Sequence, residues 1–306
     1  MIIFGQGALR CHPHAAKELF ALSDNDLDTF DKAFSGHIGH VVKNMVRALV
    51  LALSRGMLAM SVPRGPSRKY YKKLSWASAV FAFWADVAMG VYGGNLKFKE
   101  RITGRFADIL IWMYMITATL RRFEAEGRQK EHQPMLEYSI RHAFNEIQKA
   151  FEGIFYNIEL PGMRWLTRGP LSWWARMNKF ASPANDQIGM KISEILQTPG
   201  KLRDDLTTPG VYLPAGDQQG LGMLDDVFLK SFEAKGIIRK IRKAIKDGKI
   251  PKNKPERSLD EALEAGVITA SEADLMRNVE ELRYEAIMVD SFTVEQYKAK
   301  NLRKSA

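Results

Sequence analysis

The residues best suited to coordinate a metal ion stand near the amino end, in the run Cys11-His12-Pro13-His14. A thiol and two imidazoles within four residues resemble half of a zinc site. Zinc sites usually take their ligands from two separated segments, each with its own pair of cysteines or histidines. No second Cys/His pair is present to complete a tetrahedron. We therefore expect no metal site at this run, but a loop with a half-buried thiol.

A second pair of histidines, His37 and His40, has the three-residue spacing that places two side chains on one helix face. A metalloprotease or di-iron site would add a carboxylate ligand at matching spacing, and none is present. We expect one histidine to cap or bond near the start of its helix and the other to pack against Phe34 or Met45. We therefore predict no metal site in this chain.

Two carboxylates interrupt apolar segments that are nearly long enough to cross a bilayer. Asp86 lies within 74–92 and Asp108 within 106–120. A bilayer span needs roughly twenty apolar residues and strongly disfavours a charge at its centre. We read both segments as helices buried inside protein, with their carboxylates paired structurally, Asp108 by Arg101 or Arg105. A catalytic role for either carboxylate is not expected.

Glycine clusters do not supply a nucleotide loop. Gly5-Gln6-Gly7 and the cluster at 216–222 follow no strand, and neither a GxxxxGK[ST] nor a GxSxG sequence occurs. We assign no catalytic residue in this chain, and the cofactor-binding residues stay unknown.

The positive charge is concentrated in one segment. The chain has 45 Lys+Arg against 35 Asp+Glu, and residues 235–257 carry eight of the ten excess charges. Within that segment Ile237, Ile241 and Ile245 recur every fourth residue, which predicts a basic amphipathic helix. Its isoleucines either pack on the protein body, which we favour, or lie on an anionic lipid surface or partner. Because no aromatic residues are interleaved with the cations, we expect no nucleic-acid binding.

Composition excludes several classes of protein. With 306 residues, 46% of them hydrophobic and 26% charged, the chain can build a substantial core and is not disordered. A single cysteine cannot form an internal disulfide, so a disulfide-stapled secreted scaffold is excluded. No secretory signal precedes the apolar start, and we expect a reducing, cytoplasmic location.

The positions of apolar residues predict helices almost everywhere, and no alternating run supports a strand. Pro63, Pro66, Gly93-Gly94, Gly127 and Pro134 separate the helical segments. We expect an all-α protein whose first part, residues 1–160, is an antiparallel bundle with the third helix at its centre. The expected long helices are 36–58, 70–92, 96–126 and 134–155.

Residues 161–306 read as a looser helical extension, with helices at 185–197, 221–246 and 271–288. Turn-rich sequence around Pro199-Gly200, Pro209-Gly210 and Pro214 joins the first two. Ser271, three residues before Asp274, is expected to cap the last helix in a capping box.

Several stretches, specific only in combination, resemble one family. They run through most of the chain and are densest over residues 1–128. They are Met1–Pro13 (MIIFGQGALRCHP), His37-Ile38-Gly39-His40-Val41, Asp86–Met89, Gly93–Lys97, Glu100-Arg101-Ile102, Asp108-Ile109-Leu110, Glu126-Gly127-Arg128, Lys191-Ile192 and Ile195–Gln197. Together they are similar to the C-terminal third of the long bacterial acyl-CoA dehydrogenases of fatty-acid β-oxidation.

The resemblance implies a reaction and its partners. In this family a glutamate removes the α-proton of an acyl-CoA thioester while a hydride leaves for FAD, giving trans-2-enoyl-CoA. An electron-transfer flavoprotein then reoxidises the flavin. The resemblance also implies a homo-oligomer, an upstream part of the same enzyme as partner, and possible peripheral contact with the inner face of the cell membrane.

The glutamate of the family stands in a Glu-Gly motif upstream of the segment that matches Met1-Ile2-Ile3-Phe4, and the β-domain of the flavin pocket also precedes it. We therefore interpret the chain as the C-terminal part of such an enzyme, inactive and without FAD when alone. It could be a fragment begun at an internal methionine, which we favour, or the second polypeptide of an enzyme made in two pieces. The alternative function is a basic helical module that binds anionic lipid or nucleic acid.

Overall fold

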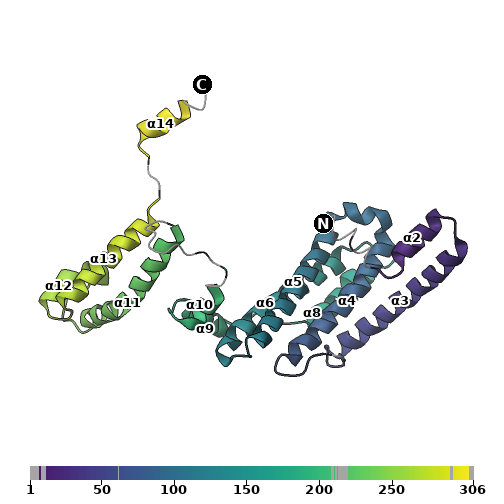
Figure 1. Ribbon diagram of the computed structural model, residues 1–306, viewed down its shortest axis with the longest axis horizontal. Coiled ribbons are helices and arrows are strands. Elements are labelled where there is room, and N and C mark those ends of the chain that lie inside the picture. Colours follow the sequence, from purple (N-terminus) through teal and green to yellow (C-terminus); the bar gives the residue numbers. More distant parts are fainter. Residues whose placement is uncertain are drawn as a thin grey trace. The chain divides into compact units, whose positions relative to one another are not determined.

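The computed structural model describes residues 12–60, 62–207, 220–289 and 292–302, together with residues 7, 210 and 212. Within these ranges the regular elements are all helical, and no strand occurs (Figure 1). The predicted all-α class is therefore confirmed. The run Met1–Arg10 apart from Gly7, the thiol of Cys11 and most of the turn-rich stretch around Pro209 and Pro214 lie outside the described residues.

The chain divides into two compact units, Met1–Ser193 and Glu194–Ala306. The division falls inside helix α9 (Asp186–Leu196). The boundary expected at residue 160 lies within the first unit, because the segment that follows it packs on the bundle. Phe180, for example, is buried in the core of the first unit, where its ring contacts Trp76 with 4.1 Å between ring centroids.

The first unit is built on four long helices, in agreement with the predicted bundle, although the helix expected at 36–58 begins at Leu27 and ends at Leu53. They are α3 (Leu27–Leu53), α4 (Arg68–Tyr92), α5 (Glu100–Ala125) and α6 (Gln133–Asn157). The main contacts pair α3 with α4 and α5 with α6. Gly93, with a φ of 49°, ends α4, and Gly127, with a φ of 83°, follows the end of α5. Glycine stands at both helix ends because it adopts this left-handed backbone conformation without steric cost.

Short helices complete this unit. Helix α2 (Ala15–Ser23) packs on α3. A 3₁₀ turn, η1 (Gly93–Phe98), joins α4 to α5, and a second, η2 (Lys130–His132), precedes α6. After α6 come α7 (Arg164–Leu166), the π-helical turn η3 (Thr167–Leu171) and α8 (Ser172–Met177), all of which follow one another against the bundle.

The core of the bundle is aromatic and aliphatic. Phe106, Phe144 and Phe151 are almost completely buried, as is the isoleucine row of α6 at Ile140, Ile147 and Ile154. Among the described helices, one segment, Arg68–Phe98, is long and apolar enough to cross a membrane. Its Trp76, Ala77 and Ala88 belong to the protein core, which accounts for much of its apolar sequence.

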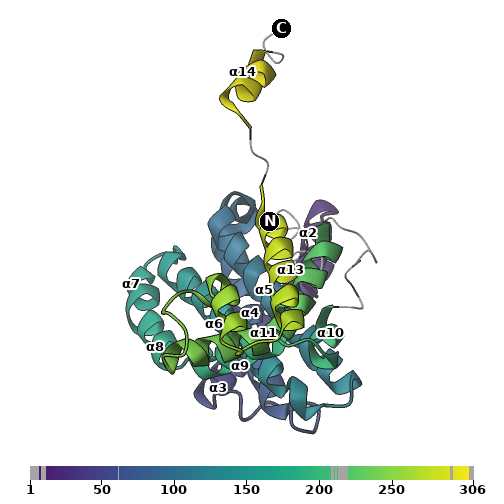
Figure 2. The ribbon, with the colours of Figure 1, turned by 90° about the vertical axis from the view of Figure 1, so that its left-hand side faces the viewer.

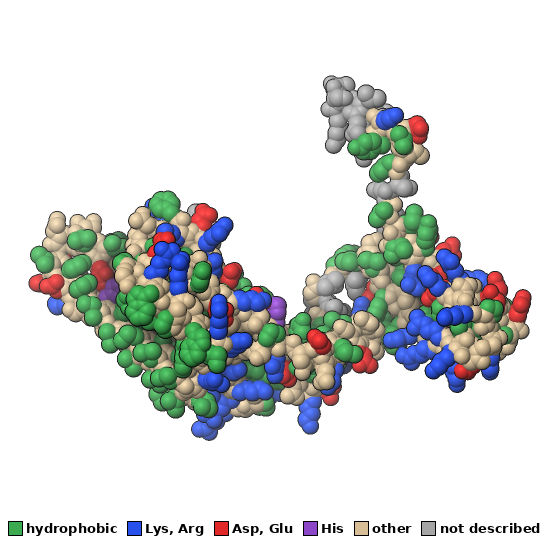
Figure 3. All heavy atoms as spheres, turned by 180° about the vertical axis from the view of Figure 1, so that it is seen from behind, with side chains coloured by type: hydrophobic (Ala, Val, Ile, Leu, Met, Phe, Trp, Pro, Cys, Tyr) green, Lys and Arg blue, Asp and Glu red, His purple; other side chains and the backbone are tan. Residues whose placement is uncertain are grey.

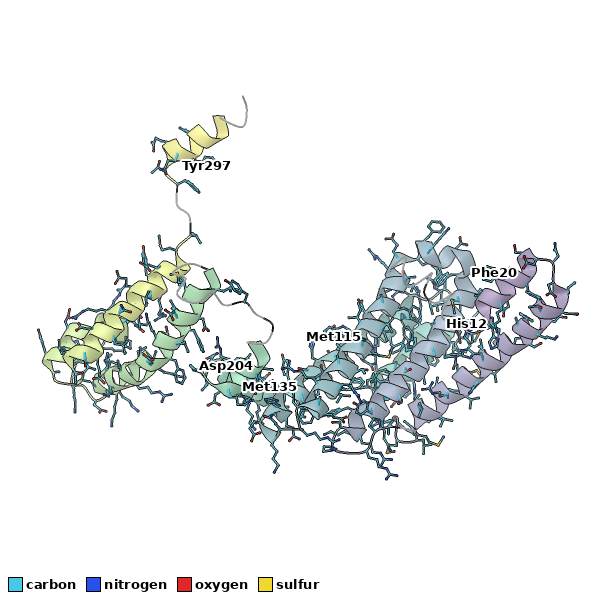
Figure 4. All side chains as sticks on the ribbon, viewed as in Figure 1. His12, Phe20, Met115, Met135, Asp204 and Tyr297 are labelled. Carbon is cyan, nitrogen blue, oxygen red and sulfur yellow. The ribbon has the colours of Figure 1, made fainter. Side chains whose placement is uncertain are left out.

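One expectation for the bundle is wrong. Helix α5 was expected to be central because its middle is apolar nearly all round, yet four large apolar side chains on one of its faces are exposed. These are Leu110, Ile111, Tyr114 and Met115 (Met115 is labelled in Figure 4). Asp108 on the same helix is also exposed, so the buried, arginine-paired carboxylate expected there is not found.

The second unit contains α10 (Lys201–Thr207), α11 (Gly220–Lys246), the turn η4 (Pro255–Arg257), α12 (Leu259–Glu264), α13 (Ala270–Ile287) and α14 (Val294–Leu302). Helices α11 and α13 run side by side (Figures 1 and 2). They enclose a small core of their own with α12, in which Ile241, Ala262 and Met276 are fully buried. This unit therefore has the means to hold its three-helix arrangement by itself.

Candidate functional site

A cluster of polar side chains lies where α2 and α3 meet α4, and His12 is its most buried histidine (Figure 4). The Nδ1 atom of His12 accepts hydrogen bonds from the backbone N–H groups of His14, at 3.2 Å, and Ala15, at 2.9 Å. These donors belong to the first turn of α2, where backbone N–H groups have no partner within the helix. His12 thus closes the start of α2, a role that side-chain oxygens usually fill.

The other ring nitrogen of His12 faces a carboxylate. Because Nδ1 acts as an acceptor, a neutral His12 carries its proton on Nε2, and this atom lies 3.6 Å from Oδ1 of Asp86 on α4. The second oxygen of Asp86 accepts a hydrogen bond of 3.1 Å from the amide of Asn44 on α3. The same amide nitrogen lies 2.9 Å from Nε2 of His40, one helical turn earlier. A buried polar chain therefore links α2, α3 and α4.

The histidine rings crowd one another. The centroid of His12 lies 4.3 Å from that of His37 and 5.0 Å from that of His40. His37 is held by Glu18 on α2, with 2.7 Å between Nδ1 and Oε1. Burial lowers the pKa of His12 below its ordinary value, and His37 lowers it further, while Asp86 opposes this shift; His40 and His14 add smaller lowering effects. Burial and the neighbouring rings therefore disfavour the charged form of His12.

Three of these side chains are close enough to be considered as ligands of one metal ion. Potential ligand atoms of His12, His40 and Asp86 lie within 4.8 Å of one another. A metal takes the unprotonated nitrogen of an imidazole, however, and in His12 that nitrogen already accepts two backbone hydrogen bonds. Binding at Nε2 would move the ring proton to Nδ1, where it would face two N–H donors. This geometry favours a hydrogen-bonded network over a metal centre.

The structure brings together residues that the sequence presented as two unrelated motifs. His12 and His14 lie beside His37 and His40, and Asp86 joins them from a helix far along the chain. The expectation that one histidine of the second pair lies near its helix start is wrong, because α3 begins at Leu27. The expectation of structural pairing for Asp86 is confirmed by its contact with Asn44.

The resemblance implies FAD in a complete enzyme, and a flavin needs a cavity with suitable polar groups. An apolar cavity of about 260 Å³ lies between α3, α4, α6 and α8, walled by side chains such as Trp76 and Phe151. Its two polar side chains, Gln148 and Asn178, are already bonded to the backbone oxygens of Ala175 and Ala52. A flavin ring needs several free donors and acceptors along one edge, and this cavity does not match that requirement.

The basic segment forms the second half of α11. Ile237 and Ile241 are buried against α13 and α12, and Ile245 packs at the edge of the same core. The prediction that the isoleucine row packs on the protein body is therefore confirmed. Arg239, Arg242 and Lys243 are exposed, and Figure 3 shows Lys and Arg side chains gathered on this unit.

An apolar surface of the first unit follows α3. Exposed residues recur along the whole helix, and hydrophobic side chains gather along this side of the unit in Figure 3. We call this surface the α3 face; it consists of Phe34, Ile38, Val42, Met45, Val46, Leu49, Val50 and Leu53, which are 38–70% exposed. Contiguous apolar surface of this kind marks interaction sites in proteins.

Comparison with known families agrees with the pattern of motifs. A family model described as "Acyl-CoA dehydrogenase, C-terminal, bacterial type" matches residues 9–292. The match covers nearly the whole chain, both units included, and the chain belongs to this family. No solved structure matches it.

Proposed function

We propose that this chain is the supporting C-terminal region of an acyl-CoA dehydrogenase that oxidises acyl-CoA to trans-2-enoyl-CoA in fatty-acid β-oxidation. Family membership supports the enzyme class. The catalytic glutamate and the FAD belong to the preceding part of the enzyme, so the chain alone does not turn over acyl-CoA. A homo-oligomeric enzyme that passes electrons to an electron-transfer flavoprotein is part of the same proposal.

The observation that carries this proposal is the α3 face. Helix α3 packs on one side only, while side chains such as Leu49, 55% exposed, and Val46, 51% exposed, face solvent on the other. An apolar helix face of this kind needs a partner surface. The exposed apolar side chains of α5 add a second such surface. We propose that the α3 face packs against the flavin-containing part of the enzyme and that the chain thereby stabilises the assembly.

Reconstitution tests this proposal. The purified chain is expected to show no flavin absorption and no acyl-CoA oxidation, but to co-purify with the catalytic part of a bacterial-type acyl-CoA dehydrogenase from the same cell. Replacing Val46 and Leu49 with Gln should abolish co-purification and leave the helical circular dichroism unchanged. Arg47→Gln, on the same exposed stretch, is the matched control.

Two results would contradict the proposal. Acyl-CoA oxidation by the chain alone would place the catalytic group within it. Co-purification that persists after Val46 and Leu49 are replaced with Gln would show that the α3 face is not the contact. Sedimentation of the chain alone tests a third outcome, which is self-association. If a second copy of the chain covers the α3 face, the proposed catalytic partner is wrong.

We also propose a cytoplasmic location with contact to the inner face of the cell membrane. The exposed cations of α11 support it, because basic surfaces are drawn to anionic lipid. Co-sedimentation with phosphatidylglycerol vesicles should weaken when Arg239 and Arg242 are replaced with Gln. Unchanged co-sedimentation would exclude this surface.

A further inference from the structure

A second cavity of the first unit has a different character from the apolar one. It measures about 480 Å³ and lies between the end of α3, the first turns of α4, the start of α6 and the segment after α8. Six cationic side chains line it: Arg55, Lys69, Lys73, Arg141, Arg176 and Lys179. Its apolar wall includes Phe144 and Phe180, both of the buried core.

The cations outnumber the carboxylates that could neutralise them. One carboxylate, Glu137, lines the cavity, and its Oε1 lies 2.8 Å from Nη2 of Arg141. Arg176 has a looser partner in Glu152, with 3.7 Å between Nε and Oε2. Among the described ion pairs, the other four cations have no carboxylate partner. Like charges gathered in this way repel one another until an anion joins them.

Two of the cations are held in place by neutral acceptors. Lys73 is half-buried, and its Nζ donates a hydrogen bond of 2.8 Å to the backbone oxygen of Phe180. Nε of Arg55 donates to Oδ1 of Asn178 at 3.2 Å, and Asn178 in turn donates to the backbone oxygen of Ala52 at 2.7 Å. Such contacts orient the cations without neutralising them. The cavity therefore presents hydrogen-bond donors at fixed positions.

The ammonium group of Lys73 lies in an electrostatically unfavourable position. Burial lowers the pKa of its ammonium group, and Arg141, Lys69 and Arg55 each lower it further. An anion within the cavity would remove this conflict by pairing with several cations at once.

We propose that this cavity binds a small molecule that carries two or more phosphate groups. Phosphate suits the donor set because guanidinium groups bind its oxygens in pairs and lysines add point charges. A single carboxylate would leave most of the cations without a partner. The apolar part of the lining, to which the exposed Met177 contributes, lies beside these donors and accommodates the non-phosphate part of the ligand. This inference does not depend on the proposed dehydrogenase function.

Titration calorimetry of the full chain at low salt, with inorganic pyrophosphate and with ADP as probes, tests the inference. The test variant carries Lys69→Gln and Lys179→Gln, two exposed residues whose replacement leaves the core intact. The control carries Lys17→Gln and Lys130→Gln, which remove the same charge from the first unit outside the cavity. The test variant should bind both probes about tenfold more weakly than the wild type, and the control should bind as the wild type does.

The two sources of phosphate are separated by a second arm. Vesicles that contain cardiolipin, a lipid with two phosphate groups, serve as the second probe. If the test variant binds them less than the control does, and if pyrophosphate competes with them, a lipid headgroup is the source. Binding of the soluble probes alone would identify a free phosphate compound. Equal affinities of test and control variants in every arm would overturn the inference, since the cations of α11 bind anions equally in both.

Discussion

His12 and Asp86 face each other across the junction of α2 and α4, with 3.6 Å between Nε2 and Oδ1 and side chains only 4% and 5% exposed. The carboxylate accepts a hydrogen bond from Asn44, and Nε2 of His12, which makes no hydrogen bond among the described residues, interacts with the carboxylate electrostatically. Contacts of this kind make a buried polar network sensitive to the loss of one member.

Replacing Asp86 with Leu should destabilise the first unit by about 1–3 kcal/mol, because the buried Asn44 amide loses its acceptor and the His12 ring loses the carboxylate that faces it. Urea denaturation followed by circular dichroism measures the change. Asp108→Leu is the matched control on α5, where the carboxylate is exposed. This substitution should stay within about 0.5 kcal/mol of the wild type, as surface changes generally do. Equal effects of the two substitutions would show that the network contributes nothing.

The stability of the first unit should fall as the pH is lowered through 6.5, the ordinary pKa of a histidine. The folded-state pKa of His12 is lowered, so the unfolded chain takes up a proton on this residue at a higher pH than the folded chain does. The contribution of His12 to stability is complete above its pKa in the unfolded chain. It is lost progressively as the pH falls to its lower pKa in the folded chain. Denaturation midpoints, measured from neutral to mildly acidic pH, report this loss of stability. Substituting His12 with Gln should flatten this dependence, whereas substituting the exposed His142 with Gln should not.

Zinc should not stabilise the histidine cluster specifically. The lone pair on Nδ1 of His12 accepts hydrogen bonds from the backbone at the start of α2. An added ion therefore has to break the first turn of α2 before it can bind this atom. Thermal unfolding with and without zinc chloride, compared between the wild type and Asp86→Asn, measures any effect of the cluster. A rise of the melting temperature in the wild type that is absent from the variant would instead establish a metal site.

The core of the second unit should depend on the isoleucine row of α11. Ile241 is fully buried among residues of α12 and α13, so Ile241→Ala removes apolar contacts and leaves a cavity. We expect a loss of about 2–4 kcal/mol in the free energy of unfolding of this unit, measured by hydrogen exchange of α11 and α13. Ile287→Ala, at a side chain 76% exposed, should change little. Unfolding unaffected by Ile241→Ala would mean that α11 does not pack as described.

The long helices could be predicted from the sequence because their signals are local. Apolar residues at helical spacing and the stops at Gly93 and Gly127 place α4 and α5 within a few residues of their observed bounds. The extent to which α5 is exposed could not be predicted, because an apolar run gives no sign of which side lacks a neighbour. Only packing decides that Leu110 faces outward while Ile109 is completely buried.

The histidine cluster could be predicted only in its parts. The spacing of His37 and His40 placed them correctly on one helix face, and the apolar surroundings of Asp86 indicated a paired carboxylate. What joins them is a contact between Asn44 and Asp86. An asparagine in an amphipathic helix does not indicate that a carboxylate on another helix will accept its hydrogen bond. A single sequence also does not show which distant helices are in contact.

The start of α13 shows how a local signal can be shifted by two residues. Ser271 with Asp274 and Thr269 with Glu272 both fit the capping-box pattern, and the structure uses the second. Oγ1 of Thr269 accepts from the backbone N–H of Glu272 at 3.3 Å, and a carboxylate oxygen of Glu272 accepts from that of Thr269 at 3.0 Å. Ser271 already lies within the helix. Lys240 of α11 pairs with Glu272 and lowers the pKa of its carboxyl group, which favours this choice of cap.

Thr269→Ala should therefore destabilise the second unit by about 1 kcal/mol, because the first turn of α13 loses its side-chain acceptor. Ser271→Ala is the control that separates the two possible caps. Its hydroxyl contacts Thr269 at 3.1 Å but accepts no backbone hydrogen bond among those described. Its loss should therefore have only a small effect on stability. Thermal unfolding of both variants, with hydrogen exchange at the first turn of α13, measures the difference. A larger effect at Ser271 than at Thr269 would restore the cap expected from the sequence and place the start of α13 two residues later.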